Sequence, residues 1–310
     1  MSNKLHRNYI RAYSKLELLA KQIVEGFITG LHKSPLHGFS VEFAEHRQYN
    51  NGESTRHIDW KLYARTEKLF LKRYEEETNL RCQILIDNSA SMYFPFNKEA
   101  SFENPNKITY AVYAAAAIIE MLKKQRDAVG LSLFTDKINL HFPAKSSPQH
   151  IQLLMSHLEQ VLIDVKPTIN QFTNASKVIH EIANIIHKRS LVIIFSDMLD
   201  AGSKDEVYKS LQHLKHNKHE VILFHIVDAA KELELEFKNR PYKFVDSESG
   251  EILKINPKEI KDFYVAKMME FKDDLKLKCF QYNIDFVEVD INKGFHEVLL
   301  PYFLKREKLY

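Results

Sequence analysis

The sequence predicts an α/β protein built on a mostly parallel, doubly wound sheet that is flanked by helices. Short apolar runs at 84–86, 191–195 and 221–227 alternate with longer segments of helical periodicity. Strands and helices that alternate in this way are typical of parallel strands joined by helical crossovers. Asp87 comes directly after the run at 84–86, and Asp197 comes two residues after the run at 191–195. Open α/β sheets bind their ligands at the carboxyl ends of the strands.

Length and composition limit the class of protein. The chain has 310 residues, with 44 Lys and Arg against 41 Asp and Glu, so the charge balance gives no reason to expect nucleic acid as a partner. Its two cysteines, Cys82 and Cys279, form no CxxC pair, which favours a reducing cytoplasm. The longest apolar run, Ala111 to Ile119, is far shorter than the roughly 20 residues that cross a bilayer. We therefore expect a soluble, cytoplasmic protein with no membrane span.

The first element is an amphipathic helix between Ser14 and Gly30. Ser14 and Glu17 form a capping box, and the apolar positions recur at helical spacing. These positions are Leu16, Leu19, Ala20, Ile23 and Phe27. We expect the helix to dock on the rest of the chain, and a helix that binds a partner is the alternative.

Residues 36–80 interleave glycines, aromatics and charges without a long helical period. This pattern predicts short strands and turns that end in an alternating strand over 68–74. The acidic triplet at 75–77 is expected to be a solvated turn rather than a metal site. Residues 1–80 would thus be a helix and a β-rich extension packed on a core domain at 81–310.

The core domain begins with the apolar strand at 84–86. Further strands are predicted over 130–134, 138–142 (a hairpin partner of the strand before it), 191–195 and 221–227, with helices near 107–124, 148–162, 175–188 and 203–217. Right-handed crossovers would place the loops after Ile86, Phe195 and Val227 along one edge of the sheet.

Residues 231–256 interrupt the alternation of strands and helices. Alternating segments at 233–237, 242–245 and 251–255 surround the turn at Ser249-Gly250, which predicts an antiparallel, hairpin-like insertion. Asn256-Pro257 then opens a long helix to about 282, and a strand over 284–289 and a C-terminal helix close the domain.

The candidate chemistry begins in the loop after the strand at 84–86. Asp87, Ser89 and Ser91 stand at alternate positions and would present one carboxylate and two hydroxyls. Such a hard oxygen surface suits Mg²⁺ or Mn²⁺ better than zinc.

Two further ligands are expected from other loops. Thr173 lies just ahead of a predicted helix, with Thr168 as its competitor, although a threonine there can also be an ordinary helix cap. Asp197 follows the strand at 191–195, at the sheet edge where Asp87 is expected.

This set of residues resembles the metal-ion-dependent adhesion site of von Willebrand factor A domains. The resemblance implies that Ser89, Ser91 and Thr173 touch the cation directly, while Asp87 and Asp197 act largely through water. It also implies an open coordination position that takes a carboxylate from a protein partner. The expected cation is Mg²⁺, with Mn²⁺ or Ca²⁺ as alternatives.

Nearly the whole chain resembles domain-of-unknown-function family 58, whose members are bacterial and archaeal. The matching residues are Ser34-Pro35, Gly38, Val41-Glu42-Phe43, His46-Arg47-x-Tyr49, Gly52, Arg56 to Thr66, Lys72 to Glu77, Asp228 and Asp246-x-Glu248-x-Gly250. The resemblance implies a von Willebrand factor A-like (Rossmann-like) fold and a MoxR-type AAA+ ATPase as partner. Asn51 to Ser54 depart from the commoner Pro-Gly-Asp-Asp, which weakens any role for an acidic pair at that turn.

Two other groups of residues have mainly structural explanations. Arg56, Asp59, Trp60 and Arg65 can form a buried polar network, with a surface that recognises a partner as the alternative. The histidines at 213, 216 and 219 lack the spacing of a zinc site, and His180 and His187 are expected at the surface.

The function expected from these residues is a non-catalytic, divalent-cation-dependent module that captures an acidic residue of a protein partner. It would work with the ATPase in maturation or remodelling of protein complexes. The alternative is a Mg²⁺-dependent phosphohydrolase or nuclease that uses Asp87 and Asp197. However, Ser89 stands where an aspartyl-phosphate phosphatase would carry a second Asp, and a two-metal nuclease needs more carboxylates. A third class, a structural protein whose site holds no metal, is disfavoured by the full set of polar ligands.

Overall fold

The computed structural model describes eight stretches of the chain: residues 15–27, 46–48, 60–72, 80–96, 100–163, 174–199, 204–246 and 250–307. The chain divides into two compact units. One contains residues 1–27 and 80–310, and the other contains residues 28–79. The sequence analysis grouped the N-terminal helix with the β-rich extension, and that division into domains stays a prediction.

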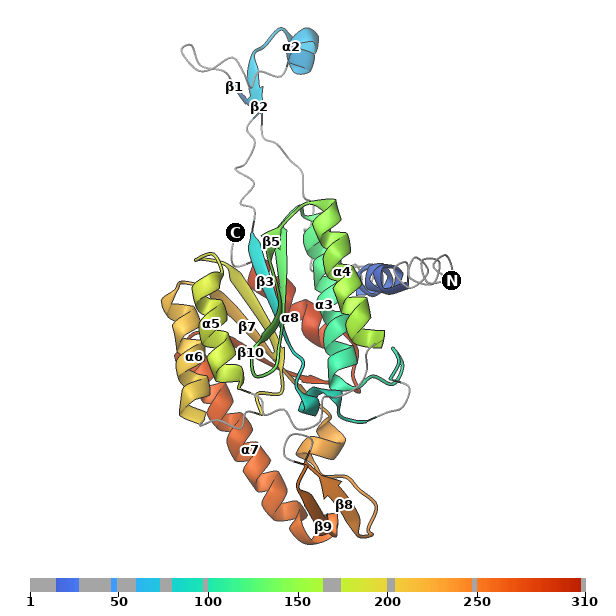
Figure 1. The fold of residues 1–310 in the computed structure, drawn as a ribbon. Coiled ribbons are helices and arrows are strands. Elements are labelled where there is room, and N and C mark those ends of the chain that lie inside the picture. Colours follow the sequence, from blue (N-terminus) through green and yellow to red (C-terminus); the bar gives the residue numbers. More distant parts are fainter. Residues whose placement is uncertain are drawn as a thin grey trace, which may run out of the picture. The chain divides into compact units, whose positions relative to one another are not determined.

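The larger unit contains a six-stranded sheet in the order β10-β7-β6-β3-β4-β5 (Figure 1). The strands are β3 (Arg81–Asp87), β4 (Ala128–Phe134), β5 (Ile138–Lys145), β6 (Leu191–Ser196), β7 (Glu220–Val227) and β10 (Asp285–Asp290). All neighbouring strands pair in parallel except β5, which is antiparallel to β4. The predicted fold class, a mostly parallel von Willebrand factor A-like sheet, is therefore confirmed.

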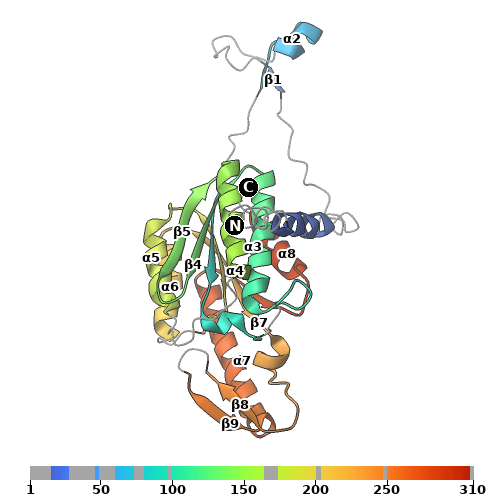
Figure 2. The same cartoon turned by 45° about the vertical axis from the view of Figure 1, so that its right-hand side comes forward.

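Helices cover both faces of this sheet (Figure 2). The helices α3 (Lys107–Lys124), α4 (Pro148–Ile163) and α8 (His296–Glu307) share one hydrophobic cluster with the helix at residues 15–27. On the other face, α5 (Ala175–Ile185), α6 (Lys204–His216) and α7 (Pro257–Gln281) form a second cluster.

The two helical layers explain why the central strands are apolar on both sides. Along β3, Ile84 and Ile86 belong to the first cluster, whereas Leu85 between them belongs to the second. All three side chains are fully buried, because successive residues of a strand point to opposite faces of the sheet.

The helix at residues 15–27 docks on the first cluster, as the sequence predicted. Leu16, Ala20 and Val24 recur at helical spacing and are at most 3% exposed. Glu17 forms an ion pair with Lys123 of α3, with 2.7 Å between Glu17 Oε1 and Lys123 Nζ. Ser14, the predicted cap, lies outside the described residues.

The insertion after β7 differs from the prediction in its first part. Residues 229–233 form a π-helix, η3 (Ala229–Leu233), and no strand forms over the described residues 233–237. The Asp228 side chain accepts a hydrogen bond from the Lys231 amide, so it caps this helical turn, a local bond that competes with an extended strand. The predicted hairpin follows as β8 (Tyr242–Val245) paired antiparallel with β9 (Ile252–Ile255).

The smaller unit contains β1 (His46–Gln48), which pairs antiparallel with β2 (Phe70–Lys72), and helix α2 (Trp60–Thr66). The strand β2 lies within the predicted strand at 68–74. The helix α2 corrects the expectation of strands and turns only, and its Lys, Leu, Ala and Arg residues all favour helix. Arg56, Asp59 and the acidic triplet 75–77 lie outside the described residues, so the predicted network and solvated turn stay predictions.

No helix among the described residues is both long and apolar enough to span a lipid bilayer.

A histidine pair joins α5 to α6 and corrects the prediction that His180 lies on the surface. His180 is partly buried, and its Nδ1 atom lies 2.9 Å from Nδ1 of His213. Burial, helped by the neighbouring His213, lowers the pKa of His180. This hydrogen bond needs an unprotonated nitrogen as acceptor, so acid should weaken the contact between the two helices.

The free energy of unfolding is therefore expected to fall as the pH drops below about 6.5, the ordinary pKa of histidine. The folded state binds fewer protons than the unfolded state there, since the pKa of His180 is lowered on folding. We expect the loss between pH 7 and pH 5, measured by urea denaturation, to be smaller in His180→Gln than in the unmodified protein. His187→Gln, which changes an exposed histidine at the end of the same helix, is the control and should leave the loss unchanged. An equal loss in both variants would contradict the prediction.

Candidate metal site at the sheet edge

Asp87 anchors the site from the end of the central strand β3. Its side chain is buried, and both of its oxygens accept hydrogen bonds. Oδ1 takes the Ser89 amide at 2.9 Å, and Oδ2 takes the Ser196 hydroxyl at 2.7 Å. Ser196 is the last residue of β6, the neighbour of β3 in the sheet. The carboxylate is thus held rigidly between two adjacent strands.

Ser89 and Ser91 lie in the turn that follows, where the short 3-10 helix η2 (Ala90–Tyr93) begins. Their hydroxyl oxygens are 3.0 Å apart. Ser89 is buried, and Ser91 is partly exposed. The two hydroxyls therefore converge on one point next to the Asp87 carboxylate.

Asp197 reaches the same place from the end of β6. Its Oδ1 accepts the Leu199 amide at 3.1 Å, and the Ser91 hydroxyl also hydrogen-bonds to it. Asp87, Ser89, Ser91 and Asp197 thus lie together at one edge of the sheet. Thr173 and Thr168, the two candidates for the third loop, lie outside the described residues.

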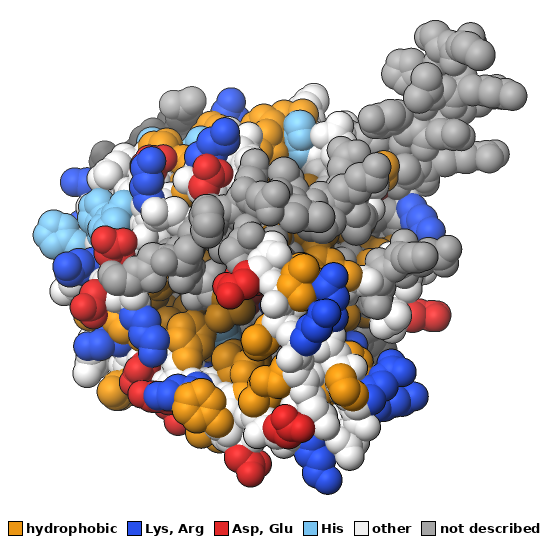
Figure 3. Space-filling view, turned by 60° about the horizontal axis from the view of Figure 1, so that its bottom comes forward, with side chains coloured by type: hydrophobic (Ala, Val, Ile, Leu, Met, Phe, Trp, Pro, Cys, Tyr) orange, Lys and Arg blue, Asp and Glu red, His pale blue; other side chains and the backbone are white. Residues whose placement is uncertain are grey.

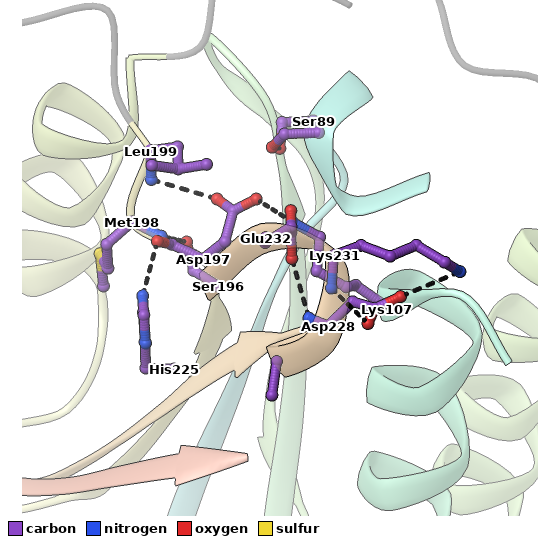
Figure 4. Close-up of polar contacts among 12 residues, drawn as sticks. Ser89, Lys107, Ser196, Asp197, Met198, Leu199, His225, Asp228, Lys231 and Glu232 are labelled. Carbon is purple, nitrogen blue, oxygen red and sulfur yellow. Dashed lines mark hydrogen bonds and ion pairs between the residues drawn. The ribbon is translucent and has the colours of Figure 1, made fainter. Parts of the chain in front are cut away.

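Lys107 is a central residue that the sequence analysis did not identify. It is the first residue of α3, and its side chain is fully buried. Its Nζ lies 2.7 Å from Asp197 Oδ2 and 2.5 Å from Glu232 Oε1. Figure 4 shows Lys107, Asp197 and Glu232 meeting at this end of the sheet. Although burial acts in the opposite direction, the two carboxylates raise the pKa of Lys107, so its ammonium stays charged.

Glu232 connects this ion pair to the insertion. It belongs to η3, and its second carboxylate oxygen accepts the Asp228 amide at 2.8 Å. Asp228 in turn accepts a hydrogen bond from the Asn292 side chain at 3.2 Å. A continuous polar network therefore runs from Asp197 through Lys107 to the base of the insertion.

The pKa values of the two aspartates of the site are shifted in opposite directions. Burial and the nearby Asp197 carboxylate raise the pKa of Asp87 to about 7. Burial acts in the same direction on Asp197, but the Lys107 ammonium together with the hydrogen bonds from Ser91 and the Leu199 amide lowers the pKa of Asp197. Near neutral pH, Asp87 is consequently the carboxylate whose charge has no fixed countercharge.

His225 supports the site from β7. Its Nε2 donates a hydrogen bond to the backbone carbonyl of Asp197 at 3.0 Å, so the ring fixes the loop that carries the carboxylate. Burial lowers the pKa of His225 to about 4, so the imidazole is neutral and adds no positive charge.

The described part of the site fits a hard divalent cation. Asp87, Asp197 and Glu232 supply three carboxylates, and the Lys107 ammonium contacts two of them, Asp197 and Glu232. A second cation would offset the remaining negative charge, and the hydroxyls of Ser89 and Ser91 are ligands that Mg²⁺ and Ca²⁺ accept. Within the described ranges, no three His, Cys, Asp or Glu residues form a group that could hold a metal.

The mostly parallel six-stranded sheet with helices on both faces has the von Willebrand factor A-like fold. The chain belongs to the family described as "Protein of unknown function DUF58", whose model matches residues 45–272.

Among curated proteins, the chain is similar to two that are described as uncharacterized, one from Mycobacterium bovis and one from Mycobacterium tuberculosis. Each is 30% identical over 139 residues, which is 45% of this chain and 42% of the relative. The match therefore spans less than half the length of these relatives.

Among solved structures, the chain is similar to BatB from Bacteroides thetaiotaomicron, with a TM-score of 0.43 and 12% identity over 74% of this chain and 100% of that one. It is also similar to an aerotolerance-related membrane protein from Bacteroides fragilis, with a TM-score of 0.42 and 14% identity over 71% and 97% of the two chains.

Proposed function

We propose that this protein is a non-catalytic module that binds a protein partner through a divalent cation at the edge of its sheet. The observation that carries the proposal is the convergence of the Ser89 and Ser91 hydroxyls, 3.0 Å apart, beside a buried Asp87 whose pKa is raised by burial and by Asp197. Uncompensated negative charge behind two neutral ligands favours a bound cation.

Ser89, Ser91 and Thr173 would hold Mg²⁺ (or Mn²⁺ or Ca²⁺), with Asp87 and Asp197 acting through water. When bound, the cation supplies a coordination position that accepts a carboxylate from the partner. Neutral direct ligands leave the cation electrophilic, which favours an incoming acidic side chain. Lys107 favours the ionised form of Asp197 and positions it, whereas the Ser196 hydroxyl holds the Asp87 side chain in place.

The geometry of Asp87 favours binding over catalysis. A nucleophilic aspartate needs a free oxygen that faces the substrate, whereas both oxygens of Asp87 accept hydrogen bonds and only 1% of the residue is exposed. The alternative phosphohydrolase or nuclease would be favoured by turnover of p-nitrophenyl phosphate or single-stranded DNA that is lost in Asp87→Ala.

The partner in this proposal presents an acidic side chain. We expect the protein to act together with a MoxR-type AAA+ ATPase. Support for the ATPase comes from membership of the family, because the resemblance to that family implies such an ATPase as partner. Co-purification of such an ATPase with the tagged chain, in Mg²⁺ but not in EDTA, would support this part of the proposal.

Replacing Ser89 and Ser91 together with alanine is expected to weaken binding of Mg²⁺ or Mn²⁺ at least 10-fold, because both converging hydroxyls are lost. Isothermal titration calorimetry with each metal measures the affinity. Ser147→Ala, which removes an exposed hydroxyl at the start of α4, should bind as the unmodified protein does. Equal affinities in the double variant and in the control would overturn the metal site.

A further inference from the structure

On one face of the hairpin β8–β9, the aromatic side chains of β8 pack against Phe237. Tyr242 and Phe244 point to the same side of β8, and their rings lie 5.3 and 5.4 Å from the ring of Phe237. Arg240 stacks on Tyr242 at 5.0 Å. These contacts give the hairpin a small aromatic cluster of its own.

The opposite face of the hairpin, here called the outer face, consists of two cross-strand pairs. Lys243 lies directly opposite Lys254, and Val245 lies directly opposite Ile252. All four residues are exposed, Val245 by 53% and Ile252 by 50%. Like charges directly opposite each other destabilise a strand pair, and exposed β-branched residues contribute little to it. The outer face therefore adds little to the stability of the hairpin, but it is complementary to a ligand that is both acidic and apolar.

Charge also sets the direction in which such a ligand would lie. Asp246 and Glu251 are exposed at the tip of the hairpin, just beyond Val245 and Ile252. Acidic groups of a ligand would be repelled by this tip and attracted to the lysine pair nearer the base. Figure 1 shows that the hairpin extends from the same end of the sheet as the candidate metal site. Figure 3 views this end and shows hydrophobic side chains interspersed with both basic and acidic side chains.

The first turn of the insertion, η3, is linked to the candidate metal site by buried ion pairs. Glu232 of η3 pairs with Lys107, and Lys107 pairs with Asp197 (Figure 4). Buried ion pairs fix geometry because separating them leaves unpaired charges. The segment that leads into the hairpin is thus anchored at the candidate metal site.

We propose that the outer face of β8–β9 is a second contact region for the same protein partner, and that the partner presents a single extended segment in which acidic residues stand beside aliphatic ones. Lys243 and Lys254 bind acidic side chains, Val245 and Ile252 cover the aliphatic ones, and a further acidic side chain reaches the sheet edge. This inference rests on the proposed function for that last contact only.

Selection of random 12-residue peptides displayed on phage, with the full chain as target in Mg²⁺, tests the inference. We expect the selected peptides to be enriched in Asp and Glu next to Val, Ile or Leu. Affinity of a selected synthetic peptide, measured by fluorescence anisotropy, should fall at least 10-fold in the double variant Lys243→Glu, Lys254→Glu. It should also fall in Val245→Ser, Ile252→Ser.

The matched control is the double variant Lys124→Glu, Lys188→Glu, which changes the net charge equally. Both of these lysines are exposed. Lys124 is the last residue of α3, and Lys188 lies in the turn between α5 and β6, so both lie ahead of the strands β4 and β6 and at the opposite edge of the sheet. Circular dichroism confirms that each variant is folded. Selected peptides without acidic enrichment, no enriched peptides, or equal affinity for the hairpin variants and the control would each overturn the inference. Repeating the anisotropy measurements in EDTA separates the two proposals. If EDTA leaves the affinity of the unmodified protein unchanged while the hairpin variants still bind more weakly, the result counts against the metal site and leaves the hairpin contact standing.

Discussion

Replacing Lys107 with methionine is expected to destabilise the folded protein by about 3–5 kcal/mol, the usual effect of removing one partner from a buried ion pair. The ammonium is fully buried and contacts Asp197 and Glu232 at 2.7 and 2.5 Å. Methionine fills a similar volume but leaves two buried carboxylates without a countercharge. Urea denaturation followed by circular dichroism measures the change in the free energy of unfolding.

Lys123→Met is the matched control because it removes the same group from the same helix. Lys123 pairs with Glu17 and Glu120, but 36% of its side chain is exposed. Exposed ion pairs contribute about 0–1 kcal/mol, so this variant should lose little. Adding Glu232→Gln to Lys107→Met should recover part of the lost stability, since one unpaired charge is removed. Similar losses in the two single variants would show that Lys107 does not form the buried pairs described above.

Replacing Gly130 with alanine is expected to have the second largest effect, a loss of about 3 kcal/mol, at the upper end of the range for overpacking. Gly130 lies in β4, and a β-carbon there would lie 2.5 Å from the carbonyl oxygen of Phe142 and 2.8 Å from the amide nitrogen of Ala144. It would also collide with the amide oxygen of Gln83. Because two of these atoms belong to the backbone of β5, relief requires a shift of the whole strand. The midpoint of thermal unfolding should fall by several degrees.

Gly26→Ala tests whether this loss comes from the close approach of the strands. Gly26 lies in the N-terminal helix, and a β-carbon there would meet nothing within 4 Å. Alanine favours helix over glycine by about 1 kcal/mol, so this variant should be slightly more stable than the unmodified protein. A stable Gly130→Ala variant would mean that β4 and β5 can separate without cost.

The arrangement of the sheet was predictable because it depends on patterns that extend over whole elements. The apolar runs that form β3, β6 and β7 are buried on both faces, and such runs report burial directly. The same reasoning placed Asp87 and Asp197 at one edge, since parallel strands end at the same edge of a sheet.

Lys107 and Glu232 were missed because their roles depend on contacts between distant parts of the chain. The alternating stretch that begins at residue 233 resembles a strand, so Glu232 was assigned to no site. The structure instead has a π-helix over Ala229–Leu233, which Asp228 caps. One signal for Lys107 was available. A lysine as the first residue of an otherwise apolar helix is opposed by the helix dipole, and α3 has no acidic residue in its first turn. A positive charge at that position points to a negative partner elsewhere.

The strand order has a consequence for folding during synthesis. The central strand β3 pairs with β6, and Cys82 lies opposite Leu191. Cys82 therefore cannot pair with Leu191 until roughly 110 further residues have been synthesised. At about 5–20 residues per second, a ribosome needs roughly 5–20 seconds to make that stretch. During this interval one edge of the apolar strand β3 has no partner from the sheet. The nascent chain is therefore exposed to aggregation at this strand, and the step that protects it is the emergence of β6.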